Sequence, residues 1–113
     1  MDCIFCKIIN SEIPAKLIHQ DDKVVAFADI SPQAPIHLLI VPKKHIPTIL
    51  DLEEVDKDLI GHVYLVAKEL AAKNNIEGSG FRVVTNCNKD AGQEVFHIHF
   101  HLLGGRKMDW PPG

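Results

Sequence analysis

The sequence predicts an α+β fold in two layers: an antiparallel sheet of about five strands, one long helix, and a short helix near the amino terminus. Short apolar segments bounded by Gly and Pro recur along the chain, and one apolar stripe has the period of a long helix. The connections are too short for repeated crossover helices, which favours antiparallel pairing. With 113 residues, 46% of them hydrophobic and 24% charged, we expect a single domain over residues 1–113.

The first part of the chain contains three of these elements. Residues 4–9 are rich in apolar side chains and can form one or two helical turns. Residues 24–28 have the character of a strand, and residues 29–35 form a loop because two prolines prevent regular pairing. Residues 37–41 are almost all apolar, which predicts a central strand buried on both faces.

The long helix follows. Asp51 and Glu54 stand three residues apart before an apolar series, so they predict a helix start of the capping-box kind. The series recurs at spacings of four and three, which gives one stripe about four turns long. Its members are Val55, Leu59, Val63, Val66 and Leu70. Asn74-Asn75 and the glycines at 78 and 80 end the helix, which we expect to lie across the sheet.

Two further strands are predicted, over residues 81–85 and over residues 97–103. The second strand alternates His97, His99 and His101 with large apolar side chains, and successive side chains on a strand point to opposite faces. The three imidazoles therefore share one face, while the apolar side chains face the core. From the residues alone this face is either a metal site, since neutral imidazoles can converge on zinc, or a site of histidine chemistry.

Composition excludes some partners. The net charge of -3 leaves no basic field for a polynucleotide backbone, so we expect a small ligand and no nucleic acid. No apolar run approaches the roughly 18 to 20 residues that span a bilayer, and the start of the chain has no basic segment followed by an apolar one. We therefore expect no membrane association and a cytoplasmic location.

The cysteines are sparse and odd in number, which favours reduced thiols. Cys3 and Cys6 form a Cys-x-x-Cys pair, which is a redox motif, half of a zinc site or a coincidence. A redox role is the least favoured of the three, because thioredoxin-like motifs follow a strand and this pair does not.

Several segments together resemble the histidine triad nucleotide-binding (Hint) proteins of the histidine triad (HIT) superfamily. They are Gly92 to Phe96, the histidine strand, Gly104-Gly105-Arg106 and the ending Trp110-Pro111-Pro112-Gly113. Residues 29–35, His37 and residues 42–45 occur in the same order and at similar separations, so the likeness covers nearly the whole chain.

The resemblance implies nucleophilic catalysis. His99 would attack the α-phosphorus of a purine nucleoside phosphoramidate or related nucleotide, giving a covalent nucleotidyl-histidine with no metal in the chemical step. An ordinary imidazole is largely neutral at pH 7 and keeps a lone pair for such an attack. His101 and the backbone near His97 would orient the ring, and His37 would line the phosphate region.

The resemblance also implies a nucleotide pocket. The amides of Gly92, Gln93 and Val95 and the side chain of Asn86 would contact phosphate, and Asp29 would bind both ribose hydroxyls. The base pocket would consist of Ile4, Phe5, Ile8, Phe27 and Ile30. From the residues alone, Asn86 and Gln93 are equally explained as turn residues, whereas Asp29 is better explained as the start of a loop. The five apolar residues alone would be assigned to the core.

Glu94 departs from the family pattern, since many members carry a serine at this place that touches phosphate or the leaving group. A carboxylate directed inward would repel a phosphate. The side chain either points outward or donates a proton to a departing amine.

Two features beyond the pocket are implied. Some members of the family bind structural Zn²⁺ through a cysteine pair and two histidines, and the matching residues here are Cys3, Cys6, His45 and His97. The family is dimeric, and its carboxy-terminal tail, which here carries Trp110, reaches the neighbouring active site. This predicts a twofold homodimer whose interface uses the long helix. Two other functions stay open: a zinc-dependent hydrolase with the triad as metal ligands, and a nucleotide-binding scaffold with incidental hydrolysis.

Overall fold

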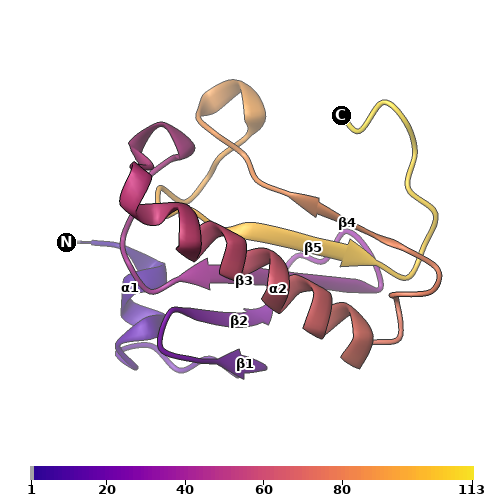
Figure 1. Ribbon diagram of the computed structural model, residues 1–113, viewed down its shortest axis with the longest axis horizontal. Coiled ribbons are helices and arrows are strands. Elements are labelled where there is room, and N and C mark those ends of the chain that lie inside the picture. The colour runs from indigo at the N-terminus through magenta and orange to yellow at the C-terminus, as the bar shows by residue number, and fades with distance from the viewer. Residues whose placement is uncertain (1) are drawn as a thin grey trace.

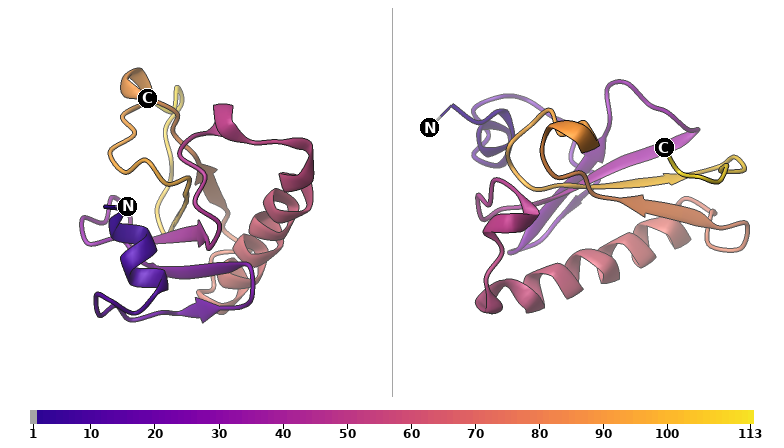
Figure 2. Two further views of the ribbon diagram at one scale, coloured as in Figure 1. Left: turned by 90° about the vertical axis from the view of Figure 1, so that its left-hand side faces the viewer. Right: turned by 90° about the horizontal axis from the view of Figure 1, so that it is seen from above.

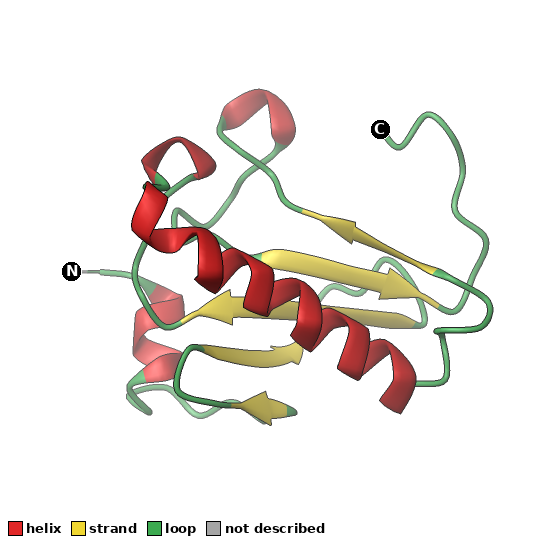
Figure 3. Cartoon of the chain, viewed as in Figure 1, coloured by secondary structure: helices red, strands yellow, loops and turns green. Residues whose placement is uncertain are grey.

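The computed structural model describes residues 2–113 and contains one five-stranded antiparallel sheet in the order β1-β2-β3-β5-β4 (Figure 1). The strands are β1 (His19–Gln20), β2 (Val24–Ala28), β3 (Ile36–Pro42), β4 (Phe81–Val84) and β5 (Phe100–Gly104). The helices are α1 (Ile4–Ile9) and α2 (Lys57–Lys73), shown in red in Figure 3. The predicted fold class is confirmed. Neither helix within residues 2–113 has the length and apolar character needed to cross a bilayer.

The sheet is covered on both faces. Helix α2 lies along one face and the short helix α1 lies on the other (Figure 2). Side chains of α2 pack with Ile40 and Leu102 in one apolar cluster, and Phe5 of α1 packs with Val25 and Leu39 in a second cluster. Strand β3 therefore has buried side chains on both faces, as predicted for residues 37–41.

The predicted start of the long helix is wrong. Two short 3₁₀ turns precede α2, and a capping box closes each of them, through Thr48 with Asp51 and through Glu53 with Asp56. The extended backbone of Leu52 separates the turns and prevents one continuous helix. Asp51 thus caps a turn rather than α2, which begins at Lys57.

Most of the predicted apolar stripe is confirmed. Val63, Val66 and Leu70 are buried against the sheet, and Leu59 packs at the edge of the same cluster. Val55 is instead 77% exposed, because it precedes α2 and does not share the helical period. The helix ends at Lys73 with Asn74 as its C-cap, at the predicted place.

The histidine strand is shorter than predicted. Strand β5 begins at Phe100, because the preceding backbone bonds to a loop: the Ile98 amide donates to the Ile46 carbonyl at 2.6 Å. The alternation of faces nevertheless continues through residues 97–102. Ile98, Phe100 and Leu102 lie in the cluster beneath α2, whereas the His97 and His99 rings contact Phe5 of α1 on the other face. Strand β4 likewise ends one residue before the predicted Thr85.

Strand β1 was not predicted, since it is only two residues long. It lies beside a polar bridge in which Asp21 Oδ2 accepts hydrogen bonds from His19 Nε2 at 2.7 Å and from His62 Nε2 at 2.8 Å. Both histidines are half-buried. The bridge ties the edge of the sheet to α2.

Candidate active site and metal site

A pocket of about 410 Å³ lies on the α1 face of the sheet. Its apolar wall contains Ile4, Phe5, Ile8, Phe27, Ile30 and Val95. Its polar wall contains Asp29, His37, Asn86, Gly92, Glu94, His99 and His101. The structure thus brings these predicted residues together in one cavity whose size suits a small molecule.

The apolar end is built from aromatic rings. Phe5 and Phe27 meet edge to face with centroids 5.7 Å apart, and Phe5 meets the His99 ring in the same way at 5.1 Å. Ile4 and Ile30 are exposed at the rim. A flat apolar ring can therefore enter between α1 and β2, with its polar substituents directed toward the histidines.

The hydrogen bond of His99 determines its reactive nitrogen. Nδ1 lies 2.7 Å from the carbonyl oxygen of His97, which can only accept, so Nδ1 carries the proton. In the neutral ring the lone pair is then on Nε2. Thr85 Oγ1 donates to the His99 carbonyl at 3.1 Å and holds the backbone at this position. The half-buried His99 is therefore oriented as a nucleophile or base through Nε2.

A second chain of hydrogen bonds sets the protons of His37 and His101. The Gln33 amide donates to His37 Nδ1 at 2.9 Å, so the neutral His37 ring carries its proton on Nε2. His37 Nε2 lies 2.9 Å from His101 Nδ1 and donates to it. His101 consequently carries its own proton on Nε2, which makes that atom a donor.

His101 is held in its neutral form. Burial lowers its pKa to about 4, and the neighbouring His99 and His37 act in the same direction because a second positive charge would be repelled. Asp29 opposes this effect more weakly. The ring therefore stays uncharged around neutral pH and can act as a hydrogen-bond donor.

Asp29 lies between the pocket and the two histidines. Its Oδ2 is 3.4 Å from His37 Nε2 and 3.9 Å from His101 Nδ1, while Oδ1 accepts from the Ser31 amide at 2.8 Å. Three such ligand atoms could face a cation. A metal-bound neutral imidazole, however, has its proton on the other nitrogen, and in His37 that nitrogen already accepts from an amide. The group is thus better suited to proton transfer.

The loop before the histidines places its polar groups differently from the prediction. The Gln93 side chain is buried and holds the loop, because Nε2 donates to the carbonyls of Pro47 and Val95 and Oε1 accepts from the Asn88 amide. The Gly92 and Gln93 amides donate to carbonyls within the loop and are not free for phosphate. Among the described residues, the Val95 amide meets no backbone acceptor outside helices and strands.

Four pocket residues were not predicted as functional: Ala28, Ser31, Gln33 and Leu39. Leu39 stands two residues after His37 on the same strand, so the alternation of side chains could have identified it. Gln33 acts on His37 through its backbone amide, which no side-chain pattern reveals.

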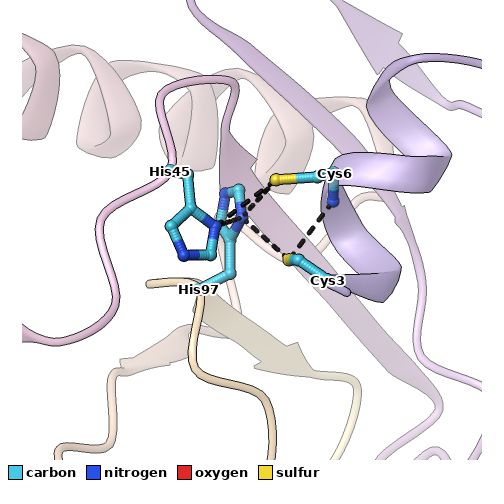
Figure 4. A group of neighbouring side chains, drawn as sticks. All are labelled: Cys3, Cys6, His45 and His97. Atoms are coloured by element: carbon cyan, nitrogen blue, oxygen red, sulfur yellow. Dashed lines mark hydrogen bonds between the residues drawn. The ribbon is translucent and has the colours of Figure 1, made fainter. Parts of the chain in front are cut away.

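A separate group of side chains, the Cys/His cluster, consists of Cys3, Cys6, His45 and His97 (Figure 4). Its four ligand atoms all lie within 4.8 Å of one another. The Cys6 Sγ atom is 3.3 Å from His45 Nδ1, and the two Nδ1 atoms are 3.1 Å apart. Cys3 Sγ lies 3.4 Å from His97 Nδ1. Ligands around a tetrahedral Zn²⁺ ion are separated by about 3.3 to 3.8 Å, so this cluster could bind a metal ion.

The surroundings of His97 favour metal binding. Nε2 donates to the Pro42 carbonyl at 2.7 Å, which leaves the lone pair on Nδ1, the atom that faces the cysteines. Burial lowers the pKa of this fully buried ring, so it stays neutral. Burial and the adjacent Cys3 raise the pKa of the Cys6 thiol. A bound dication would stabilise the thiolate and would therefore lower this pKa.

The three triad imidazoles do not converge on one point. His97 faces the Cys/His cluster, His99 bonds to a backbone carbonyl, and His101 bonds to His37. Within residues 2–113, they do not form a group of ligand atoms with metal-site spacing. The geometry therefore disfavours a hydrolase in which the triad holds a catalytic metal.

Comparison with known protein families identifies a HIT domain over residues 10–108. The chain belongs to the HIT family. A HIT-like protein of Synechocystis sp. is 50% identical over 112 residues, which cover 99% of this chain and 97% of the relative. The crystal structure of a HIT family hydrolase from Legionella pneumophila has 53% identity and a TM-score of 0.97, covering 99% of this chain and 100% of that chain. A histidine triad protein from Clostridium difficile has 46% identity and a TM-score of 0.92, covering 96% and 95% of the two chains.

Proposed function

We propose that this HIT protein is a nucleotide-binding hydrolase that acts on the α-phosphorus of purine nucleoside phosphoramidates or related nucleotides. The observation that carries the proposal is the free Nε2 lone pair of His99, set beside an apolar pocket and a histidine donor. A solved structure with 53% identity is described as a HIT family hydrolase, which supports the general class of reaction.

The proposed reaction has two displacement steps at phosphorus. In the first, the Nε2 lone pair of His99 forms a bond to phosphorus, and the P–N bond of the substrate breaks. The electron pair of that bond leaves with the amine, which takes up one proton. In the second step water attacks phosphorus, the P–Nε2 bond breaks, and the nucleoside monophosphate and a proton are released.

The other pocket residues have complementary roles in this proposal. His101 Nε2–H, held in place through His37, donates a hydrogen bond to a phosphoryl oxygen and keeps its proton. The Val95 amide and the Asn86 side chain donate to the phosphoryl oxygens as negative charge develops there. Asp29 accepts hydrogen bonds from the two ribose hydroxyls.

The test is to trap the intermediate. The protein is mixed with an adenosine 5′-phosphoramidate and quenched in acid, and the adenylylated residue is identified by mass spectrometry. His99→Ala should lose the adduct and reduce turnover by more than about a thousandfold. Gln20→Ala, a change at an exposed position outside the pocket, is the control. Retention of turnover in His99→Ala would exclude the mechanism, and tight binding of nucleotide without turnover in the unmodified protein would identify a scaffold instead.

We also propose that the Cys/His cluster binds Zn²⁺ as a structural ion. Four ligands would close the coordination sphere and fasten α1 to the loops that carry His45 and His97. Titration with Co²⁺ as a spectroscopic substitute should give thiolate absorption bands with one ion per chain. Cys6→Ser should weaken binding and lower the melting temperature in the presence of metal, whereas Cys87→Ser, outside the cluster, should do neither. Equal binding by both variants would refute this assignment.

We further propose that the chain forms a twofold homodimer. Tyr64 and Leu65 on α2 are 51% and 65% exposed, and β4 is an edge strand with Phe81 40% exposed. Exposed apolar groups and an unpaired edge favour contact with a second copy. Sedimentation should show a dimer, and Leu65→Glu should shift it toward the monomer. A monomer at all concentrations would contradict the proposal.

A further inference from the structure

A second cleft, with a volume of about 570 Å³, adjoins the nucleotide pocket. Ile4, Glu94 and Val95 line both cavities. The two cavities therefore share a wall that is formed by Ile4 of α1 and by the loop directly before the triad. Glu94 is exposed at this junction, so its carboxylate can reach ligand groups in either cavity.

The charged side chains that line the two cavities are mainly acidic. The nucleotide pocket is lined by the carboxylates of Asp29 and Glu94 and by no lysine or arginine. In the second cleft, Lys7 is paired with Asp2 at 3.0 Å. Within residues 2–113, no cationic side chain forms an ion pair with Glu94. Glu94 thus supplies an uncompensated negative charge to the junction.

This charge distribution discriminates between leaving groups. A polyphosphate or carboxylate leaving group would bring additional negative charge toward Glu94 and be repelled. An amine whose chain ends in an ammonium group would be attracted. Phe96, which is 48% exposed in the second cleft, and Ile4 offer apolar contact to the hydrocarbon part of such a chain.

We propose that the leaving group of the substrate extends into the second cleft and that Glu94 selects amines carrying a distal positive charge. This inference rests on the proposed function and specifies its substrate class. In the first step the bond between His99 Nε2 and phosphorus forms while the P–N bond of the substrate breaks, and the amine leaves with that electron pair and one proton taken from water. The distal ammonium takes no part in bond making and acts only by its charge.

Three adenosine 5′-phosphoramidates test the selection. Their amines carry chains of equal length that end in an ammonium, a hydroxyl or a carboxylate group. The measured quantity is the ratio of kcat/KM between the ammonium and carboxylate substrates at low salt. An exposed ion pair contributes about threefold per charge, so the ratio should be about tenfold in the unmodified protein and should fall at high salt.

Variants locate the effect. Glu94→Gln should bring the ratio close to one, while Glu77→Gln, the same change at an exposed position outside both cavities, should keep it. Phe96→Ala should reduce the preference for a long alkyl amine over an unsubstituted phosphoramidate by about fivefold, the effect of burying about one methylene group.

The outcomes distinguish a failure of this inference from a failure of the proposed function. Turnover of all three substrates with a ratio that is equal in the unmodified protein and in Glu94→Gln overturns the role of Glu94 alone. An unchanged alkyl preference in Phe96→Ala overturns the placement in the second cleft. Absence of both turnover and adenylylated protein with every substrate overturns the proposed function, and this inference with it.

Discussion

The neutral state of His101 predicts how folding stability depends on pH. The folded protein lowers the pKa of this ring from 6.5 to about 4, so between these values the unfolded chain binds a proton that the folded protein does not. The stabilisation that comes from this ring is therefore fully present above its pKa in the unfolded chain, and it is lost as the pH falls toward its pKa in the folded protein. Within this interval, each unit by which the pH falls lowers the free energy of unfolding by about 1.4 kcal/mol. Between about pH 7 and about pH 4.5 the loss is roughly 2 kcal/mol, allowing for the 18% exposure of the side chain.

The assay is urea unfolding of the unmodified protein and of His101→Gln at several pH values in this interval. Glutamine retains an acceptor for His37 but does not titrate. Other groups titrate in both proteins, so the difference between the two curves isolates His101. The unmodified protein should lose roughly 2 kcal/mol more than the variant on acidification. Parallel curves would show that His101 titrates normally in the folded state and would refute the argument for a neutral donor.

Two further substitutions test the packing and the polar bridge. Gly104→Ala should lower the free energy of unfolding by about 1 to 3 kcal/mol, because a Cβ there would lie 2.5 Å from Ile76 Cδ1. Gly78→Ala, where a Cβ meets nothing within 4 Å, is the control, and equal losses in thermal or urea unfolding would contradict the packing argument. Asp21→Asn should cost about 2 to 3 kcal/mol near pH 7, because its single amide oxygen cannot replace both carboxylate oxygens, one of which accepts from two imidazoles and the other from two backbone amides. A variant as stable as the unmodified protein in urea would show that the bridge contributes nothing.

The hydrogen bonds to Asp21 also lower the pKa of its carboxyl. Burial alone would raise the pKa of this carboxyl, but hydrogen bonds from His19, His62 and two backbone amides hold it far below its ordinary value. The sequence offered no sign of this bridge, because the three residues come from a loop, an edge strand and α2.

Local patterns predicted much of the fold. The apolar runs of α1, β2 and β3 were located to within one residue, because their burial is visible as composition. Helix α2 was predicted from its stripe, but its first turn was misplaced. The capping box that Asp51 forms stabilises the start of a 3₁₀ turn as well as it would stabilise the start of an α-helix. The capping signal therefore marked a short turn and not the long helix.

The order of residues alone establishes the alternation of imidazole and apolar side chains, and with it the face on which His99 and His101 lie. Backbone stereochemistry enforces that alternation locally, even where the ladder of β5 has not begun. Only the tertiary structure decided what each ring does. Contacts distant in sequence, of His97 with the Pro42 carbonyl and of His101 with His37, determine which nitrogen carries the proton in those two rings. In His99 the local bond to the His97 carbonyl does the same. An imidazole offers two nearly equivalent nitrogens, so its chemistry depends on its partners and not on its identity.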